Sequence, residues 1–149
     1  MHSIHQVMSN DHKRCDDMFV EAQKFAARKD WATARQYTDL FIRNVLQHFN
    51  HEETILFPTF EQSTGMFHGP TEMMCEEHKT MCDLFDDLRQ AAANENASRF
   101  LGVAETLFIF MQQHNMKEEN VLYPMIDQHC PANELERLRN LQYSAGNAA

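Results

Sequence analysis

The sequence predicts an all-α protein, an up-down-up-down four-helix bundle built from two duplicated helix pairs, with a short extra helix at its C-terminal end. Three observations predict this fold. Apolar residues recur every three or four positions along four long segments, as they do on one face of a helix. Proline and glycine number four each in 149 residues, and they fall mostly where those segments end. The second half of the chain also repeats the first at an offset of 66 residues.

The first half is expected to contain two helices. One spans about residues 3–28, and the other begins after Asp30, whose side chain can cap it. Pro58 kinks or ends this second helix, because proline lacks the backbone N–H that a helix interior needs. The face of the first helix carries Ile4, Met8, His12, Cys15, Phe19, Ala22 and Ala26. The face of the second carries Ala34, Tyr37, Phe41, Val45, His48, Glu52, Ile55 and Thr59.

The second half is expected to repeat this pair. Residues 63–69 form the central loop, and Pro70 suits the first position of the third helix. The face of the third helix carries Met74, His78, Met81, Phe85, Leu88 and Ala92. After a polar connector at residues 94–98, the face of the fourth carries Phe100, Ala104, Leu107, Met111, His114, Glu118, Val121 and Met125.

A last short amphipathic helix past Pro131 is expected to pack on the end of the bundle. Its apolar positions are Leu135, Leu138 and Leu141. The sequence therefore predicts one domain over residues 1–143 and a disordered tail over residues 144–149, because an apolar pattern is absent there.

Composition and charge exclude several classes of function. The net charge is −9, with 13 basic and 22 acidic residues and no basic run, so nucleic acid is not expected as a partner. No apolar stretch approaches the roughly 20 residues that cross a bilayer, and the first residues lack a signal-peptide pattern, so no membrane association is expected. The four cysteines form no C-x-x-C pair and are expected to be reduced and mostly buried. We therefore expect a cytoplasmic protein.

Histidine and glutamate take the same spacing in both halves. Each half has a histidine, a second histidine 36 residues later, and a glutamate four residues further on. About 16 residues down one helix, a short turn and about 16 residues back return the chain to its starting level. The two histidines of each half should therefore meet at one height. The six residues are His12, His48 and Glu52 in the first half and His78, His114 and Glu118 in the second.

These six residues are predicted to be metal ligands. Burial of Glu52 and Glu118 without partners would be costly, and the apolar faces offer no lysine or arginine to neutralise them. A histidine and a glutamate four residues apart on a helix can reach the same cation. The set divides into two metal positions, each held by one histidine pair, with both glutamates as bridges. Such ligands suit iron or manganese; zinc is an alternative, and so is a metal-free polar network.

Several neighbouring residues have two interpretations. Glu53 and Glu119 point about 100° away from the ligand glutamates, so they lie either in solvent or against a ligand histidine that they orient. Tyr123 replaces Phe57 in the repeat, which leaves core packing and a redox role open. Two methionines one turn before the site are expected to pack over it: Met8 and Met74. The remaining histidines are expected at the surface, with the first and fourth as alternative site neighbours: His2, His5, His51, His68 and His129.

The motifs that carry the ligands resemble those of a known family. They are Asp11-His12, His48-x3-Glu52 with Leu56-Phe57-Pro58, Glu77-His78, and His114-x3-Glu118 with Leu122-Tyr123-Pro124. Over about residues 3–128 the chain resembles the haemerythrin-like HHE cation-binding family. The resemblance implies a non-haem di-iron centre in a four-helix bundle, bridged by two carboxylates and by an oxo or hydroxo group from water. It also implies Fe2+/Fe3+ cycling and reactivity toward dioxygen, nitric oxide or peroxide.

Two departures from the oxygen-carrying members narrow the function. Those proteins have an H-x3-H pair on the third helix, where this chain has Met74 as the partner of His78. They also have H-x4-D on the fourth helix, where this chain has His114-x3-Glu118. The iron–sulfur repair proteins of the wider family share the H-x3-E pattern. Reversible oxygen carriage is therefore not expected.

The sequence predicts a non-haem di-iron protein that binds or reacts with a small ligand such as dioxygen, nitric oxide or peroxide in sensing, scavenging or iron handling. One alternative is a di-iron enzyme, either a peroxidase or a donor of iron to damaged iron–sulfur clusters. The other is a structural bundle with zinc or no metal. The sequence leaves open whether a redox partner or a homodimer exists.

Overall fold

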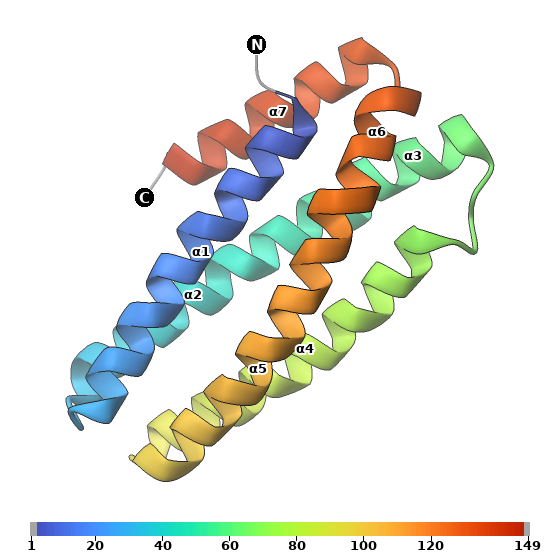
Figure 1. Ribbon diagram of the computed structural model, residues 1–149. Coiled ribbons are helices and arrows are strands. Elements are labelled where there is room, and N and C mark those ends of the chain that lie inside the picture. The colour runs from blue at the N-terminus through green and yellow to red at the C-terminus, as the bar shows by residue number, and fades with distance from the viewer. Residues whose placement is uncertain (1–2, 148–149) are drawn as a thin grey trace.

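Long antiparallel helices form the body of the protein (Figure 1). The structure, a computed structural model, describes the backbone of residues 3–147 and the side chains of residues 3–140. Within this range all regular structure is helical, which confirms the predicted all-α fold. The bundle consists of α1 (Ile4–Ala27), α2 (Trp31–His51), α4 (Pro70–Ala93) and α5 (Ala97–Lys117). None of the helices in residues 3–147 has the length and apolar character needed to cross a membrane.

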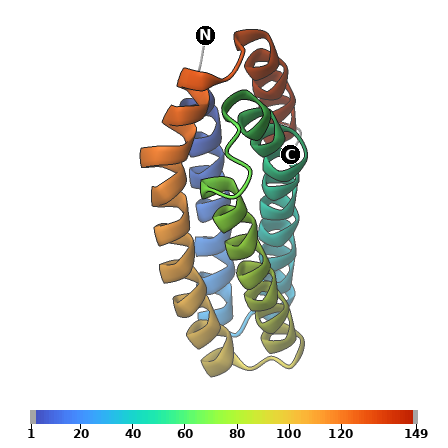
Figure 2. The same ribbon diagram turned by 90° about the vertical axis from the view of Figure 1, so that its right-hand side faces the viewer.

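The four long helices are neighbours in the order α1, α2, α4, α5, and α5 closes the bundle by packing against α1 (Figure 2). The turns after α1 and α4 lie at one end, and the connection from α3 (Phe57–Thr64) to α4 lies at the other. This is the predicted up-down-up-down arrangement of two helix pairs. It places one helix of each pair beside a helix of the other pair, as a site shared by both halves requires.

Local signals in the sequence set the helix ends. Ser3 forms a capping box with Gln6 at the start of α1. The predicted cap Asp30 accepts a hydrogen bond from the N–H of Thr33, and Pro70 is the first residue of α4. Gly65 ends α3 with φ of +75°, a left-handed conformation that glycine adopts without steric penalty.

Two π-helical turns interrupt the helices at the predicted ligand glutamates. They are η1 (Glu52–Leu56) between α2 and α3, and η2 (Glu118–Leu122) between α5 and α6 (Tyr123–His129). Pro58 and Pro124 follow them, and a proline ring clashes with the carbonyl four residues earlier in an α-helix. The wider π turn relieves this clash, with the N–H after each turn bonded to the glutamate carbonyl five residues back.

Because of these π turns, the residues that are buried beyond the site differ from the predicted ones. A π turn adds one residue to the turn, so the buried positions that follow it move on by one. Ile55 and Thr59 were expected to face the core, but they are only half-buried. In the second half, Val121 is 53% exposed and Met125 is half-buried. The core positions are instead Leu56, Phe57, Phe60, Leu122, Tyr123 and Ile126.

The predicted extra helix is α7 (Ala132–Asn147), which packs against α1 and α2 (Figure 1). Leu135 and Leu138 are buried as expected, and the side chain of Leu141 lies outside the described part. α7 includes part of the segment 144–149, whose last two residues lie outside the described range. The disordered tail and the domain limit at residue 143 stay predictions.

Two apolar clusters fill the interior on either side of a buried polar layer. One cluster packs toward the turns after α1 and α4 and contains Phe19, Phe41, Phe85 and Phe100. The other packs toward α7 and contains the predicted site neighbours Met8 and Met74. The six predicted ligands lie between these two clusters. A polar site is therefore enclosed by apolar side chains from both ends of the bundle.

Candidate metal centre

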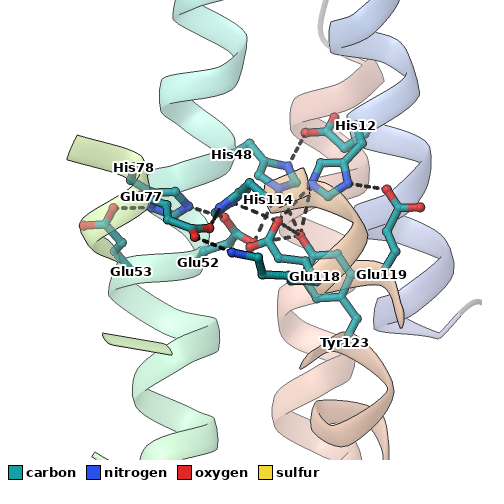
Figure 3. Close-up of polar contacts among 12 residues, drawn as sticks. His12, His48, Glu52, Glu53, Glu77, His78, His114, Glu118, Glu119 and Tyr123 are labelled. Carbon is teal, nitrogen blue, oxygen red and sulfur yellow. Dashed lines mark hydrogen bonds and ion pairs between the residues drawn. The ribbon is translucent and has the colours of Figure 1, made fainter. Parts of the chain in front are cut away.

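The structure brings the six predicted ligands together in one layer of the bundle (Figure 3). Each long helix supplies one histidine, and the two π turns begin with the glutamates. All six side chains are at most 7% exposed, and both glutamates are fully buried. The contributing residues are His12 of α1, His48 of α2, His78 of α4, His114 of α5, Glu52 of η1 and Glu118 of η2.

The histidines meet in the pairs that the 36-residue spacing predicted. The ring centroids of His12 and His48 are 4.7 Å apart, and those of His78 and His114 are 5.0 Å apart. Each pair therefore lies at one height and can face a common point.

Each glutamate extends between the two histidine pairs. Oε1 of Glu52 lies 3.2 Å from Nε2 of His78, and Oε2 of Glu52 lies 3.6 Å from Nε2 of His48. Oε1 of Glu118 lies 3.1 Å from Nε2 of His12 and 3.4 Å from Nε2 of His114. Both carboxylates therefore have the position that a bridge between two cations would need.

The ligand atoms fall into two groups, each compact enough to surround a cation. In one group, atoms of Glu52, His78, His114 and Glu118 all lie within 4.8 Å of one another. In the other, the same holds for His12, His48 and Glu118. Imidazole nitrogens and carboxylate oxygens are suitable ligands for divalent transition metals.

The outward nitrogen of every site histidine contacts a carboxylate. This contact fixes the ring and directs Nε2 toward the interior, as it does around many metal ions. The acidic residues follow the repeat, because Asp11 corresponds to Glu77 and Glu53 to Glu119. The Nδ1 to oxygen distances are 2.7 Å for His48 with Asp11, 2.8 Å for His114 with Glu77, 2.6 Å for His78 with Glu53 and 2.7 Å for His12 with Glu119.

Two of these acidic residues are held in place by basic side chains. Arg14 lies one turn after Asp11 and donates to its carboxylate from Nε at 2.9 Å. Lys117 donates to Glu77 from the neighbouring helix. These basic residues pair with the outer carboxylates; among the described residues, neither Glu52 nor Glu118 forms an ion pair with lysine or arginine.

Buried polar atoms test whether a metal fits the site. Four inward atoms have no hydrogen-bond partner among the described residues, although they are buried: Oε1 of Glu52, Nε2 of His78, Nε2 of His114 and Oε2 of Glu118. Polar atoms in such surroundings normally have a partner, and a cation would supply one to all four at once. The donor set and its burial therefore fit a bound metal.

The family comparison agrees with this geometry. A family model described as Hemerythrin HHE cation binding domain matches residues 3–126. The chain belongs to the haemerythrin HHE family. The predicted resemblance is thus confirmed, and the histidine and glutamate cluster of this haemerythrin-like chain is the part of it that could hold a metal cation.

The haemerythrin-like chain also has a curated relative. An uncharacterized hemerythrin-like protein of Schizosaccharomyces pombe is 23% identical to it over 138 residues, which cover 90% of the chain. The aligned region spans 64% of the length of that relative. No solved structure matches the chain significantly.

Carboxylates control the protonation of His114 and His48. Burial lowers the pKa of His114, but Glu118, Glu52 and Glu77 together outweigh this effect and raise the pKa to about 9. Burial likewise opposes charge on His48, yet Glu52 and Asp11 raise its pKa well above the usual value. Burial raises the pKa of Glu52, but the charge of His48 and hydrogen bonds with Glu118, His48 and His78 together lower it well below its usual range. In the absence of a metal, protons on these imidazoles therefore neutralise the buried carboxylates.

Sequence reasoning left some site residues undecided and missed others. Of the two interpretations of Glu53 and Glu119, the structure supports contact with a predicted ligand histidine, His78 and His12 respectively. It gives the same role to Asp11 and Glu77, which sequence reasoning missed; their matching positions in the repeat were the signal. Tyr123 also enters the site, because its hydroxyl lies 2.7 Å from Oε2 of Glu52.

The histidines outside the site differ in their burial. His51 is 5% exposed, so its predicted surface position is wrong; α7 packs against α2 and η1 near this residue. The side chain of His68 is 89% exposed and pairs with Glu72, as expected for a surface residue, and this excludes contact with the site. His2 lies outside the described residues.

Metal binding is expected to release protons. At pH 7 the pKa of about 9 keeps His114 protonated, and only the neutral imidazole binds metal. The contribution of His114 to the apparent affinity should therefore rise by about tenfold per pH unit and level off near pH 9. Calorimetry of Co2+ binding in buffers of different ionisation enthalpy measures the protons released. Absence of proton release at pH 7 would contradict the raised pKa.

Loss of an orienting carboxylate is expected to weaken metal binding. Asp11→Asn keeps the size of the side chain but removes the charge that faces Nδ1 of His48. We expect a 10- to 100-fold loss of Co2+ affinity, roughly the effect of removing such a group elsewhere, measured by competition with a chelator. Asp17→Asn, at an exposed position of the same helix, is the matched control and should bind as the wild type does. Equal affinity in both variants would show that Asp11 does not support the site.

Proposed function

We propose that the protein binds two iron ions, one held by His12 and His48 and the other by His78 and His114. Glu52 and Glu118 would bridge them. The shared position of both carboxylates between the histidine pairs supports this assignment. The mixture of imidazole and carboxylate ligands in the core of a helical bundle favours iron, with manganese and zinc as alternatives.

A small cavity beside the His12–His48 position carries the proposal of a small ligand. It has a volume of about 10 Å³, which suits a water-sized molecule and excludes a larger substrate. Its walls are mostly apolar, so a diatomic molecule could enter where bulk water is disfavoured. The lining residues are His12, Cys15, Val45, His48, Phe49, Met81, Met111 and Asn115.

The repeat explains why this cavity lies at one metal position. Asn115 corresponds to Phe49 at the offset of 66 residues. Phe49 stacks on His78 with ring centroids 3.7 Å apart and an interplanar angle of 12°. Asn115 is smaller and lines the cavity near His12, where it offers a carboxamide. The cavity therefore gives a small ligand a place beside the His12–His48 position.

The proposed role is to bind or react with dioxygen, nitric oxide or peroxide in sensing, scavenging or iron handling. Bound iron would supply a redox-active Lewis acid at each position. The protein would hold the ions, exclude bulk water through the two apolar clusters, and admit only a small ligand beside Asn115. We place this activity in the cytoplasm, which the four free cysteines support.

A di-iron peroxidase is the second candidate. It is favoured by Tyr123, an oxidisable phenol that lies within hydrogen-bonding distance of both bridging glutamates. Sustained consumption of peroxide with an added reductant would favour this enzyme. Binding of nitric oxide or peroxide without turnover would favour the first candidate.

The metal content tests the proposal directly. Protein purified without oxygen and supplied with ferrous iron is expected to contain about two iron ions per chain by plasma mass spectrometry. Exposure to air should then produce the near-ultraviolet absorption of a ferric pair. Glu52→Ala removes one bridge and should lose iron and this absorption, whereas Glu105→Ala, on the exposed face of α5, should keep both. A zinc-only or metal-free protein would contradict the proposal.

Filling the cavity is expected to exclude the small ligand. Asn115→Phe introduces the residue that closes the equivalent space beside His78. We expect nitric oxide or azide to associate with the iron-loaded variant at least about tenfold more slowly, because the aromatic ring occupies the approach to His12. Stopped-flow absorption measures the rate, and the iron content is checked first. Gln113→Phe, at an exposed position of the same helix, is the control, and equal rates in both variants would refute this access route.

A further inference from the structure

The hydroxyl of Tyr123 lies among the ligand atoms of the His12–His48 position (Figure 3). Its oxygen is 2.7 Å from Oε2 of Glu52 and 3.0 Å from Oε1 of Glu118. It is also 3.2 Å from Nε2 of each of the two histidines. A phenol has one proton to donate, so the hydroxyl bonds one of the two carboxylates at a time, and its oxygen can accept from an Nε2 that carries a proton.

The His78–His114 position contains no such group. Its two inward Nε2 atoms and the second carboxylate oxygens of Glu52 and Glu118 are the atoms that lack a hydrogen-bond partner among the described residues. The two positions thus have the same types of ligand but differ in how these ligands are satisfied.

One residue of the repeat accounts for this difference. Phe57 corresponds to Tyr123, and both rings approach the first histidine of the opposite half. The ring centroid of Tyr123 is 5.7 Å from that of His12, and the centroid of Phe57 is 6.1 Å from that of His78. Phenylalanine lacks the hydroxyl oxygen, so only the His12–His48 position receives hydrogen bonds from its aromatic neighbour.

We propose that Tyr123 sets the order in which the two positions bind metal: the His78–His114 position binds the first cation and the His12–His48 position binds the second. This inference rests on the proposed two-metal centre. At the His78–His114 position Nε2 of each histidine contacts only a carboxylate of the site, at 3.2 Å for His78 and 3.4 Å for His114, so a first cation there displaces no hydroxyl. A cation at the other position must displace the neutral Tyr123 hydroxyl from all four of its contacts, which lowers the affinity there.

The test is a titration of the metal-depleted full chain with Co2+ alone, followed by calorimetry and by the visible absorption of bound cobalt. The wild-type chain should bind cobalt in two steps whose affinities differ by at least about tenfold. His78→Ala should remove the tighter step, and His12→Ala should remove the weaker one. These two variants assign the order to the two positions.

Variants at the paired aromatic positions test the cause. Tyr123→Phe should tighten the second step by about tenfold and change the first by less than about threefold, because it removes only the competing hydroxyl. Phe57→Tyr places a hydroxyl in the other half and should weaken the first step. Circular dichroism checks that each variant is folded. Because the two variants act on different steps, either one suffices if the other does not fold.

The results that overturn this order are distinct from those that overturn the metal centre. Two equal steps in the wild type, or an unchanged second step in Tyr123→Phe, would refute the role of the hydroxyl. A weaker second step in Tyr123→Phe would show that Tyr123 is itself a ligand, and would also refute it. No cobalt binding at all, or unchanged binding in both histidine variants, would instead refute the proposed two-metal centre.

Discussion

The burial of two carboxylates in the middle of the bundle is the constraint on which the rest of the site depends. Glu52 and Glu118 are fully buried, and in the described structure no lysine or arginine pairs with them. An isolated carboxylate in such a place is strongly disfavoured, so positive charge must be supplied from elsewhere. Protons on His48 and His114, whose pKa values are raised, provide it in the absence of a metal, and bound cations would provide it otherwise. Outer carboxylates in turn stabilise the imidazoles, so charge alternates in layers from the centre to the surface.

The sequence could predict the convergence of the six ligands because it depends only on regular geometry. The rise of a helix fixes where a chain returns after a turn, so histidines 36 residues apart meet at one height. Since His48 and Glu52 are one turn apart, they also face the same point. The offset of 66 residues then supplied the second half of the site and the helix pairing together. No knowledge of side-chain conformation was needed for these steps.

The features that the sequence did not predict arise where regular geometry ends. The π turns before Pro58 and Pro124 add one residue, which moves Tyr123 inward and leaves Val121 exposed. A strict α-helical period therefore assigns the wrong residues to the core beyond the glutamates. The sequence also could not predict which side chains meet between helices. Asp11, for example, contacts His48 of α2 and not His12, its neighbour in the chain. The position of α7 against α2 and η1, near the buried His51, was likewise not given by the apolar pattern alone.

The duplication yields two positions with the same types of candidate ligand and different surroundings. The ring of Phe49 stacks on His78 at 3.7 Å, and the ring of Phe57 lies 6.1 Å from it, so both aromatic neighbours of His78 are apolar. At the corresponding places near His12, the repeat has Asn115 on the cavity side and Tyr123 on the other. Asn115 and Tyr123 thus both lie near the His12–His48 position. Asn115 faces the apolar cluster that contains Phe41, and Tyr123 belongs to the other cluster. In the proposed two-metal centre, these surroundings would favour retention of the metal at the His78–His114 position and ligand entry at the His12–His48 position.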